Sequence, residues 1–259
     1  MSDNNKVVPI SIIIAGIIIS GSILHSRDVS WRASDRPEFN NTEEISGISS
    51  IRDNEPILGN PKADFIFIEY SDTECPFSLE FSREREKVMG AYGAEGRVAW
   101  VYRSVPTTNV TSLLKAISLE CVAESQENYK YWNYLTRIQS MDILSPEDGT
   151  PQIEMLLDSA ARENISPDSI EKCIENERHM HRVRENTKEA LAEGAKSTPF
   201  TVILLPFEIS TSKRAQITSS LADTPAEMVT IPAKSDRIFL NGFIPAELIG
   251  DVLDTLLSF

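Results

Sequence analysis

The chain has few histidines, cysteines and glycines: three, three and eleven among 259 residues. Three cysteines are too few for a small fold held together mainly by disulfides. The histidines are His25, His179 and His181, and no acidic residue near them completes a metal-binding or Ser-His-Asp spacing. The few glycines form no phosphate-binding loop. We therefore predict no metal site and no other cofactor.

Basic residues are also in the minority, since 25 Lys and Arg face 39 Asp and Glu and the formal net charge is −14. A chain of this charge cannot neutralise phosphates, so we expect no nucleic-acid partner and no attraction to anionic membrane surfaces. The content of hydrophobic residues, 41%, and of charged residues, 25%, is that of an ordinary globular protein. Collagen-like, low-complexity and wholly disordered chains are thereby excluded.

One long apolar segment, residues 7–24, carries no charged side chain. As a helix it would span about 27 Å, close to the roughly 30 Å of a bilayer core. We predict a single-pass anchor in the cell membrane, with residues 1–6 as a cytoplasmic tail and the folded domain on the extracytoplasmic side. The small residues at 20–22 leave a cleaved signal peptide open, and a buried core helix is a third alternative. Residues 25–56 have no apolar periodicity and predict a flexible linker.

Residues 57–259 predict a mixed α/β domain. The expected strands are four apolar stretches, residues 65–70, 98–102, 201–205 and 238–240. A helix beginning at Pro76 connects the first two, so these should be parallel. A block of helices over about 110–194 then interrupts the sheet, and an amphipathic helix over 245–257 ends the domain.

Cys75 follows the first strand and precedes Pro76, a residue suited to the first position of a helix. A thiol at a helix N-terminus faces free N–H groups and the positive end of the helix dipole, which favour the nucleophilic thiolate. Asp72 and Glu74 flank the thiol and oppose its ionisation. The alternative, a cysteine that merely fills the core, fits poorly with the exposed turn that the strand and the proline indicate.

Three motifs together resemble the DsbA-like branch of the thioredoxin superfamily: LGNPKA at 58–63, EYSD at 69–72 followed by Cys-Pro-Phe, and STPF at 197–200. The resemblance covers about residues 57–259. It implies a thioredoxin-like mixed sheet with an inserted helical domain, and thiol–disulfide exchange as the activity.

The resemblance also implies the roles of individual residues. Cys75 would be the nucleophile, and Glu69 a buried acid that exchanges protons with it. The substrate would be contacted by Pro76, Phe77, Thr198 and Pro199. The Thr198–Pro199 bond is expected to be cis and to face the cysteine, with a trans proline at an edge strand as the alternative. For Glu69 the alternative is a strand-end acid near solvent.

The other two cysteines, Cys121 and Cys173, lie in apolar faces of predicted helices. We expect them to form a structural disulfide within the helical insertion, since an extracytoplasmic location permits oxidation. Two buried free thiols are the alternative.

The main departure from the family pattern is Ser78, which stands where Cys-x-x-Cys has its second cysteine. A serine cannot expel a mixed disulfide, so an outside thiol or the substrate's own second thiol must release Cys75. Ser78 would instead donate a hydrogen bond to the Cys75 sulfur. This pattern predicts a monothiol isomerase or reductase acting on disulfide-containing or unfolded secreted proteins, with a membrane redox partner or a small thiol. The alternative is a redox-inactive peptide-binding module or chaperone.

Overall fold

The computed structural model describes residues 51–143, 152–222, 224–225 and 228–258. The predicted tail, the apolar segment 7–24 and most of the predicted linker lie outside these residues and stay predictions. Within the described ranges, no helix is long and apolar enough to cross a bilayer.

The described residues form a mixed sheet with the strand order β1-β3-β2-β4-β6-β5. The strands are β1 (Ile57–Gly59), β2 (Phe65–Ser71), β3 (Val98–Ser104), β4 (Phe200–Leu204), β5 (Val229–Thr230) and β6 (Arg237–Asn241). The neighbours β2 and β3 are parallel and the other neighbouring pairs are antiparallel. The predicted α/β class with a parallel first pair is therefore confirmed. The prediction omitted β1 and β5, because edge strands of two or three residues carry too little periodicity to be recognised.

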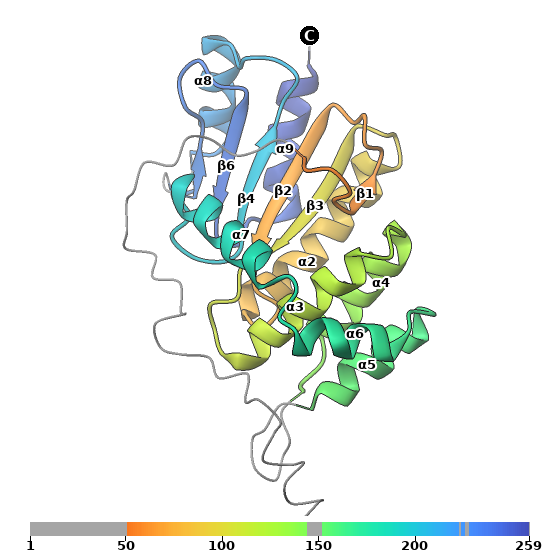
Figure 1. Cartoon of the computed structure of the whole chain (residues 1–259). Helices are drawn as coiled ribbons and strands as arrows, with labels where there is room; N and C mark the ends of the chain where they lie inside the picture. Colours follow the sequence, from red (N-terminus) through yellow and green to blue (C-terminus); the bar gives the residue numbers. More distant parts are fainter. Residues whose placement is uncertain (1–50, 144–151, 223, 226–227, 259) are drawn as a thin grey trace, which may run out of the picture. The chain divides into compact units, whose positions relative to one another are not determined.

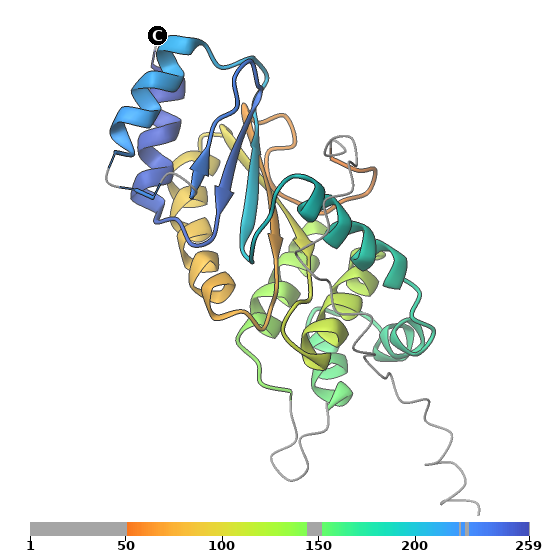
Figure 2. The ribbon, with the colours of Figure 1, turned by 90° about the vertical axis from the view of Figure 1, so that its left-hand side faces the viewer.

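Helices cover both faces of the sheet, with α2 and α9 on one face and α7 on the other (Figures 1 and 2). The remaining helices of the insertion lie past the carboxyl ends of β2 and β3 (Figure 1). The bounds are α2 (Pro76–Val88), the short π-helix η2 (Met89–Gly93), α3 (Val110–Ala123), α4 (Asn128–Gln139), α5 (Ile153–Arg162), α6 (Pro167–Glu175), α7 (Met180–Ala192), α8 (Thr211–Ser220) and α9 (Ala246–Leu257).

The central strand β2 is buried along almost its whole length because both of its faces are covered. Phe67 stacks on Trp100 with ring centroids 4.3 Å apart, and Phe81 of α2 packs against the same indole. The next residue, Ile68, faces the other way and packs with Ala190 of α7. Glu69 in turn falls on the same face as Phe67, the face that α2 covers.

The predicted linker was wrong at its end, because residues 51–56 are fixed to the domain. Glu55 accepts hydrogen bonds from Arg103 of β3 at 2.7 and 2.9 Å. Arg52 forms an ion pair with Glu189 of α7 at 2.5 Å and donates to Asn186 at 2.7 Å. These partners lie 48 or more positions further along the chain, so local composition could not reveal them.

We predict that Arg103→Met lowers the free energy of unfolding by about 3 kcal/mol. The Arg103 side chain is 1% exposed and that of Glu55 is 8% exposed, so the substitution leaves a buried carboxylate without its principal partner. Urea denaturation followed by circular dichroism measures the change.

Arg97→Met is the matched control, because Arg97 and Glu95 form an ion pair whose side chains are 43% and 65% exposed. Its removal should cost about 0–1 kcal/mol. Equal losses in the two variants would contradict the assignment of a buried network.

Candidate active site

Cys75 is the N-cap residue of α2, with extended backbone angles and Pro76 as the first helical residue. Its N–H donates to the Asp72 carbonyl at 3.1 Å, and its own carbonyl accepts from Leu79 N–H at 3.0 Å. Of the three cysteines it is the free one, and it is half-buried. The thiol therefore lies in the turn between β2 and α2, at the positive end of the helix dipole.

The Cys75 thiol donates a hydrogen bond to the carbonyl oxygen of Thr198, with an Sγ–O distance of 3.3 Å. The Thr198–Pro199 peptide bond is cis. Antiparallel pairing of Tyr70 in β2 with Phe200 in β4 places this loop beside the turn that holds the thiol. The structure thus brings together Cys75, Thr198 and Pro199, which the sequence motifs could only associate by resemblance.

The predicted role of Ser78 as a donor to the sulfur was wrong. Ser78 is fully buried, and its hydroxyl oxygen accepts from the backbone N–H of Asp72 at 3.4 Å. In the part of the chain that the structure describes, no hydrogen bond joins Ser78 to Cys75. The first turn of α2 directs Ser78 inward, and the thiol proton is instead directed at Thr198.

Glu69 is fully buried. One of its carboxylate oxygens, Oε2, accepts two hydrogen bonds. Arg85 of α2 and the indole N–H of Trp100 each lie 2.8 Å from this atom. The other oxygen, Oε1, has no hydrogen-bond partner in the described structure. Sequence reasoning placed Glu69 correctly inside but missed Arg85. The signal was its spacing from Phe81 and Val88, which puts Arg85 on the inward face of α2.

Tyr102 of β3 lies among the acidic groups of the site. Burial, together with the charges of Glu69 and Asp72, holds the pKa of Tyr102 well above its usual value. The hydroxyl therefore stays protonated, and it donates to the Ser71 carbonyl at 3.3 Å.

Asp72 is a buried carboxylate surrounded by donors. Its Oδ2 accepts from the backbone N–H and the hydroxyl of both Thr107 and Thr108, at 2.7–3.0 Å. Its Oδ1 accepts from the Glu74 N–H at 2.9 Å and from the Ser112 hydroxyl at 2.5 Å. These donors replace the hydration that the buried carboxylate has lost, and they join the turn of Cys75 to the start of α3.

Lys115 is a buried residue of α3 that sequence reasoning missed. Its ammonium group contacts the carboxylate of Glu74, the residue before Cys75, and the carbonyl of Met141. The signal was a lysine within an otherwise apolar helix face, because such a charge is buried only when it is paired. Both acids that flank the thiol are therefore partnered.

Phe77 is 61% exposed, although it directly follows the Cys75-Pro76 pair. A large apolar side chain left in solvent beside a reactive thiol suits contact with apolar parts of another chain. Pro76 is also exposed. These two predicted substrate-contacting residues therefore lie on the open side of the turn, whereas Thr198 and Pro199 are buried behind it.

A disulfide joins Cys121 of α3 to Cys173 of α6. Close to it, a cavity of about 290 Å³ is lined mostly by polar residues from segment 52–56, α3 and α7, including Arg52, Glu120 and Arg182. Removal from bulk water raises the pKa of Glu120 to about 7, against an opposing effect of Arg182. The cavity is also lined by Tyr102, but not by Cys75, Glu69 or Thr198.

We predict that Asp72→Asn destabilises the fold by about 3 kcal/mol. The amide of asparagine replaces one carboxylate oxygen by an NH₂ group, which cannot accept the hydrogen bonds that this oxygen accepts in the wild type. Equilibrium unfolding in urea provides the measurement. Asp64→Asn, at an exposed position before β2, is the control and should change stability by less than about 0.5 kcal/mol. A loss below about 1 kcal/mol for Asp72→Asn would contradict the hydrogen-bond assignment.

We predict that the free energy of unfolding depends on pH through the ionisation of Glu120. Its pKa is raised from 4.5 to about 7 on folding, so between these values the folded state holds a proton that the unfolded state has released. Stability contributed by this group is therefore lost as the pH rises from about 4.5 to 7, by on the order of 2–3 kcal/mol. Glu120→Gln should remove that loss, so the variant gains stability relative to the wild type between pH 5 and pH 8. Thermal unfolding at both pH values tests this, with the exposed Glu171→Gln as control; parallel behaviour of the two variants would contradict it.

Comparison with known proteins agrees with this geometry. A family model described as thioredoxin matches residues 52–215. No curated protein matches the sequence.

Solved structures share the fold at low sequence identity. Alpha-DsbA1 of Wolbachia pipientis aligns with a TM-score of 0.60 at 20% identity, covering 80% of this chain and 92% of that one. A thioredoxin-like oxidoreductase from Silicibacter pomeroyi gives a TM-score of 0.55 at 18% identity, over 79% and 93% of the two chains. The thiol-disulfide exchange protein alpha-DsbA2 of Wolbachia pipientis gives 0.55 at 17% identity, over 78% and 87%. With the family model spanning more than half of its residues, the chain belongs to the thioredoxin family.

Proposed function

We propose that this protein catalyses thiol–disulfide exchange on protein disulfides with Cys75 as its only nucleophile. The observation that carries the proposal is the half-buried Cys75 thiol at the N-terminus of α2, 3.3 Å from the carbonyl that precedes the cis proline. The other two cysteines are bonded to each other, and position 78 is a serine. Similar folds belong to proteins described as an oxidoreductase and as a thiol-disulfide exchange protein, which supports the same chemistry here.

The reaction begins when the Cys75 thiolate attacks one sulfur of a substrate disulfide. A mixed disulfide forms, and the other substrate sulfur leaves as a thiolate that takes up a proton. A second thiolate then attacks the substrate sulfur of the mixed disulfide and returns Cys75 to its free form. If that thiolate belongs to the substrate, the outcome is isomerisation without net oxidation. If it belongs to an outside small thiol, the products are free Cys75 and a mixed disulfide between the substrate and the small thiol.

The surroundings of the thiol suit a chain in extended conformation. Thr198 offers backbone groups next to Cys75, and Pro199 has no N–H to compete for them. Phe77 supplies an apolar surface on the open side of the turn. We therefore propose unfolded or misoxidised secreted proteins as substrates, recognised by backbone and apolar contacts and not by charge.

Glu69 is the proposed proton-exchange group of the site. Its free oxygen, Oε1, is buried without a hydrogen-bond partner, while Arg85 and Trp100 hold the other oxygen in place. A carboxyl group fixed in this way has one oxygen available for a proton. Residues 7–24 are the proposed anchor that keeps the domain at the outer face of the cell membrane.

The test is the refolding of a scrambled disulfide protein in a glutathione buffer by the full-length chain in detergent. We expect the wild type to accelerate recovery of the native substrate, and Cys75→Ala to reduce the rate to that of the buffer alone. Ser82→Ala is the matched control, since Ser82 lies on the same helix and its hydroxyl donates to the Leu79 carbonyl of that helix at 2.7 Å. It should retain the wild-type rate.

The rival function is a peptide-binding module or chaperone without redox turnover, and the buried, hydrogen-bonded Ser78 favours it. Equal refolding rates for the wild type and Cys75→Ala would establish this rival and overturn the proposal. Ser78→Cys should add oxidation of a dithiol substrate, because residue 78 then supplies the second thiol of a Cys-x-x-Cys site. Failure of this variant to oxidise the substrate would indicate that the site is not competent for exchange.

A further inference from the structure

A cluster of metal-ligating side chains surrounds the disulfide between α3 and α6. A sulfur atom of Cys121, a sulfur atom of Cys173 and a ring nitrogen of His179 all lie within 4.8 Å of one another. Glu124 adds a carboxylate oxygen, Oε1, which is 2.6 Å from His179 Nε2 and 4.0 Å from Cys173 Sγ. These residues come from α3, α6 and the cap of α7, so it is the tertiary fold that brings them together.

We propose that reduction of the Cys121–Cys173 disulfide creates a Zn²⁺ site with Cys121, Cys173, His179 and Glu124 as ligands. Two thiolates, an imidazole and a carboxylate form a donor set that suits Zn²⁺. The inference does not depend on Cys75 or on the proposed exchange activity.

The distances agree with tetrahedral coordination. Zn–S bonds of about 2.3 Å and Zn–N or Zn–O bonds of about 2.0–2.1 Å place neighbouring ligand atoms roughly 3.3–3.8 Å apart. The separations of Glu124 Oε1 from His179 and from Cys173, 2.6 and 4.0 Å, need to change by less than about 1 Å to reach that range. The two sulfurs, now bonded, must move apart by more than this once their bond is broken, because two thiolates on one tetrahedral zinc ion lie about 3.8 Å apart. Rotation of both cysteine side chains would supply this movement.

A dithiol is the reductant that we propose for the Cys121–Cys173 disulfide. The dithiol transfers two electrons and two protons to the disulfide and leaves as its own disulfide, so that Cys121 and Cys173 become thiols. Binding of Zn²⁺ then displaces the two thiol protons, because the ligands are thiolates.

The surroundings of the cluster favour the bound ion. Arg178 donates to both oxygens of Glu124 at 2.7 Å and orients this carboxylate beside His179. Two thiolates, one carboxylate, one guanidinium and Zn²⁺ sum to zero charge. Glu124 and His179 also line the cavity of about 290 Å³, which gives an ion a route to the site.

The disulfide and the metal are thus alternative cross-links between α3 and α6. In an oxidising environment the covalent bond holds the insertion together, and under a dithiol the ion holds the same two helices. The cluster would let the insertion keep its packing in both redox states.

The test is Zn²⁺ binding by the full-length Cys75→Ser chain in detergent, before and after treatment with a phosphine, which becomes a phosphine oxide as it reduces the disulfide. Equilibrium dialysis measures bound Zn²⁺, and Co²⁺ substituted for it reports thiolate ligation by its charge-transfer absorption. We expect about one equivalent of Zn²⁺ in the reduced chain only. In the reduced state, His179→Asn should weaken binding at least roughly tenfold.

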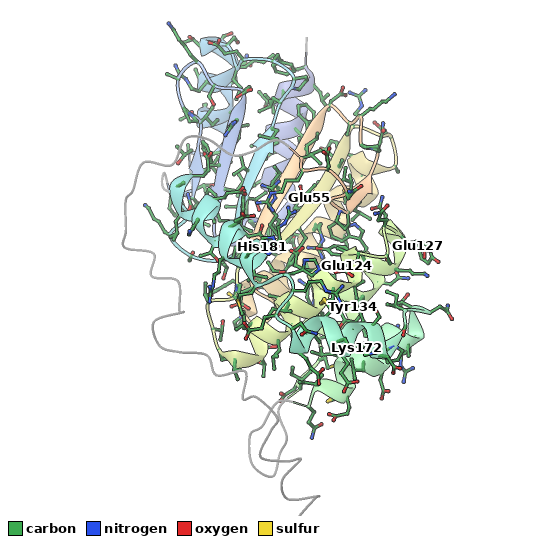
Figure 3. All side chains as sticks on the ribbon, in the orientation of Figure 1. Glu55, Glu124, Glu127, Tyr134, Lys172 and His181 are labelled. Carbon is green, nitrogen blue, oxygen red and sulfur yellow. A yellow bond between two sulfur atoms is a disulfide. The ribbon has the colours of Figure 1, made fainter. Side chains whose placement is uncertain are left out.

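His181→Asn is the matched control, since this histidine lies two residues further on, is exposed and should leave binding unchanged. Figure 3 labels Glu124, at the end of α3, and His181, on α7. Equal Zn²⁺ content in the oxidised and reduced chains, or equal affinities of the two histidine variants, would overturn the proposal. Circular dichroism follows the fold: if reduction alone melts the helices, Zn²⁺ must restore them, and failure to do so overturns the proposal as well.

Discussion

The antiparallel pairing of β2 with β4 is the constraint on which the candidate active site depends. Its register sets Tyr70 opposite Phe200, so the turn after β2 and the loop before β4 meet at one edge of the sheet. The Cys75 thiol and the Thr198 carbonyl, 123 positions apart in sequence, come within 3.3 Å of each other for this reason. A slip of one residue would turn the side chains of β2 to the opposite faces, move Glu69 away from Arg85 and separate the thiol from the loop.

The acidic residues around the thiol are the second organising feature. Glu69 is held by Arg85 and Trp100, Asp72 by backbone and hydroxyl donors, and Glu74 by Lys115. Unpartnered carboxylates at these positions would be costly in the protein interior and would oppose formation of a thiolate. With partners, they link β2, α2, β3 and α3 around the turn. The same contacts therefore stabilise the fold and limit the negative charge at the nucleophile.

The helical insertion contributes to the site and is not merely attached to it. Ser112 and Lys115 reach the turn of Cys75 from the first half of α3, while Cys121 at the other end of the same helix bonds to α6. A rigid helix thus connects the two sulfur-containing regions of the protein. Because buried polar groups need fixed partners, cross-linking α3 to α6 helps to keep these donors in place.

Much of the fold could be predicted from the sequence, because its signals are local. The apolar run of β2, the proline after Cys75 and the Ser-Thr-Pro loop are each contained in a few consecutive residues, and they indicated the strand, the helix start and the site. The buried position of Glu69 was implied by the resemblance to the DsbA-like branch, and its burial in β2 agrees with that expectation. The short edge strands β1 and β5 and the attachment of Arg52 and Glu55 had no such local signal.

What only the tertiary structure decided is which buried groups meet. The sequence by itself determined that a cysteine caps a helix after a central strand, that a Thr-Pro loop follows, and that a serine replaces the second thiol. It did not determine that Arg85 would hold Glu69, that Lys115 would reach Glu74, or that Ser78 would turn away from the sulfur. The physical reason is that such partners lie on different elements, and their meeting depends on strand register and helix rotation. Both are set by packing of the whole core and not by neighbouring residues.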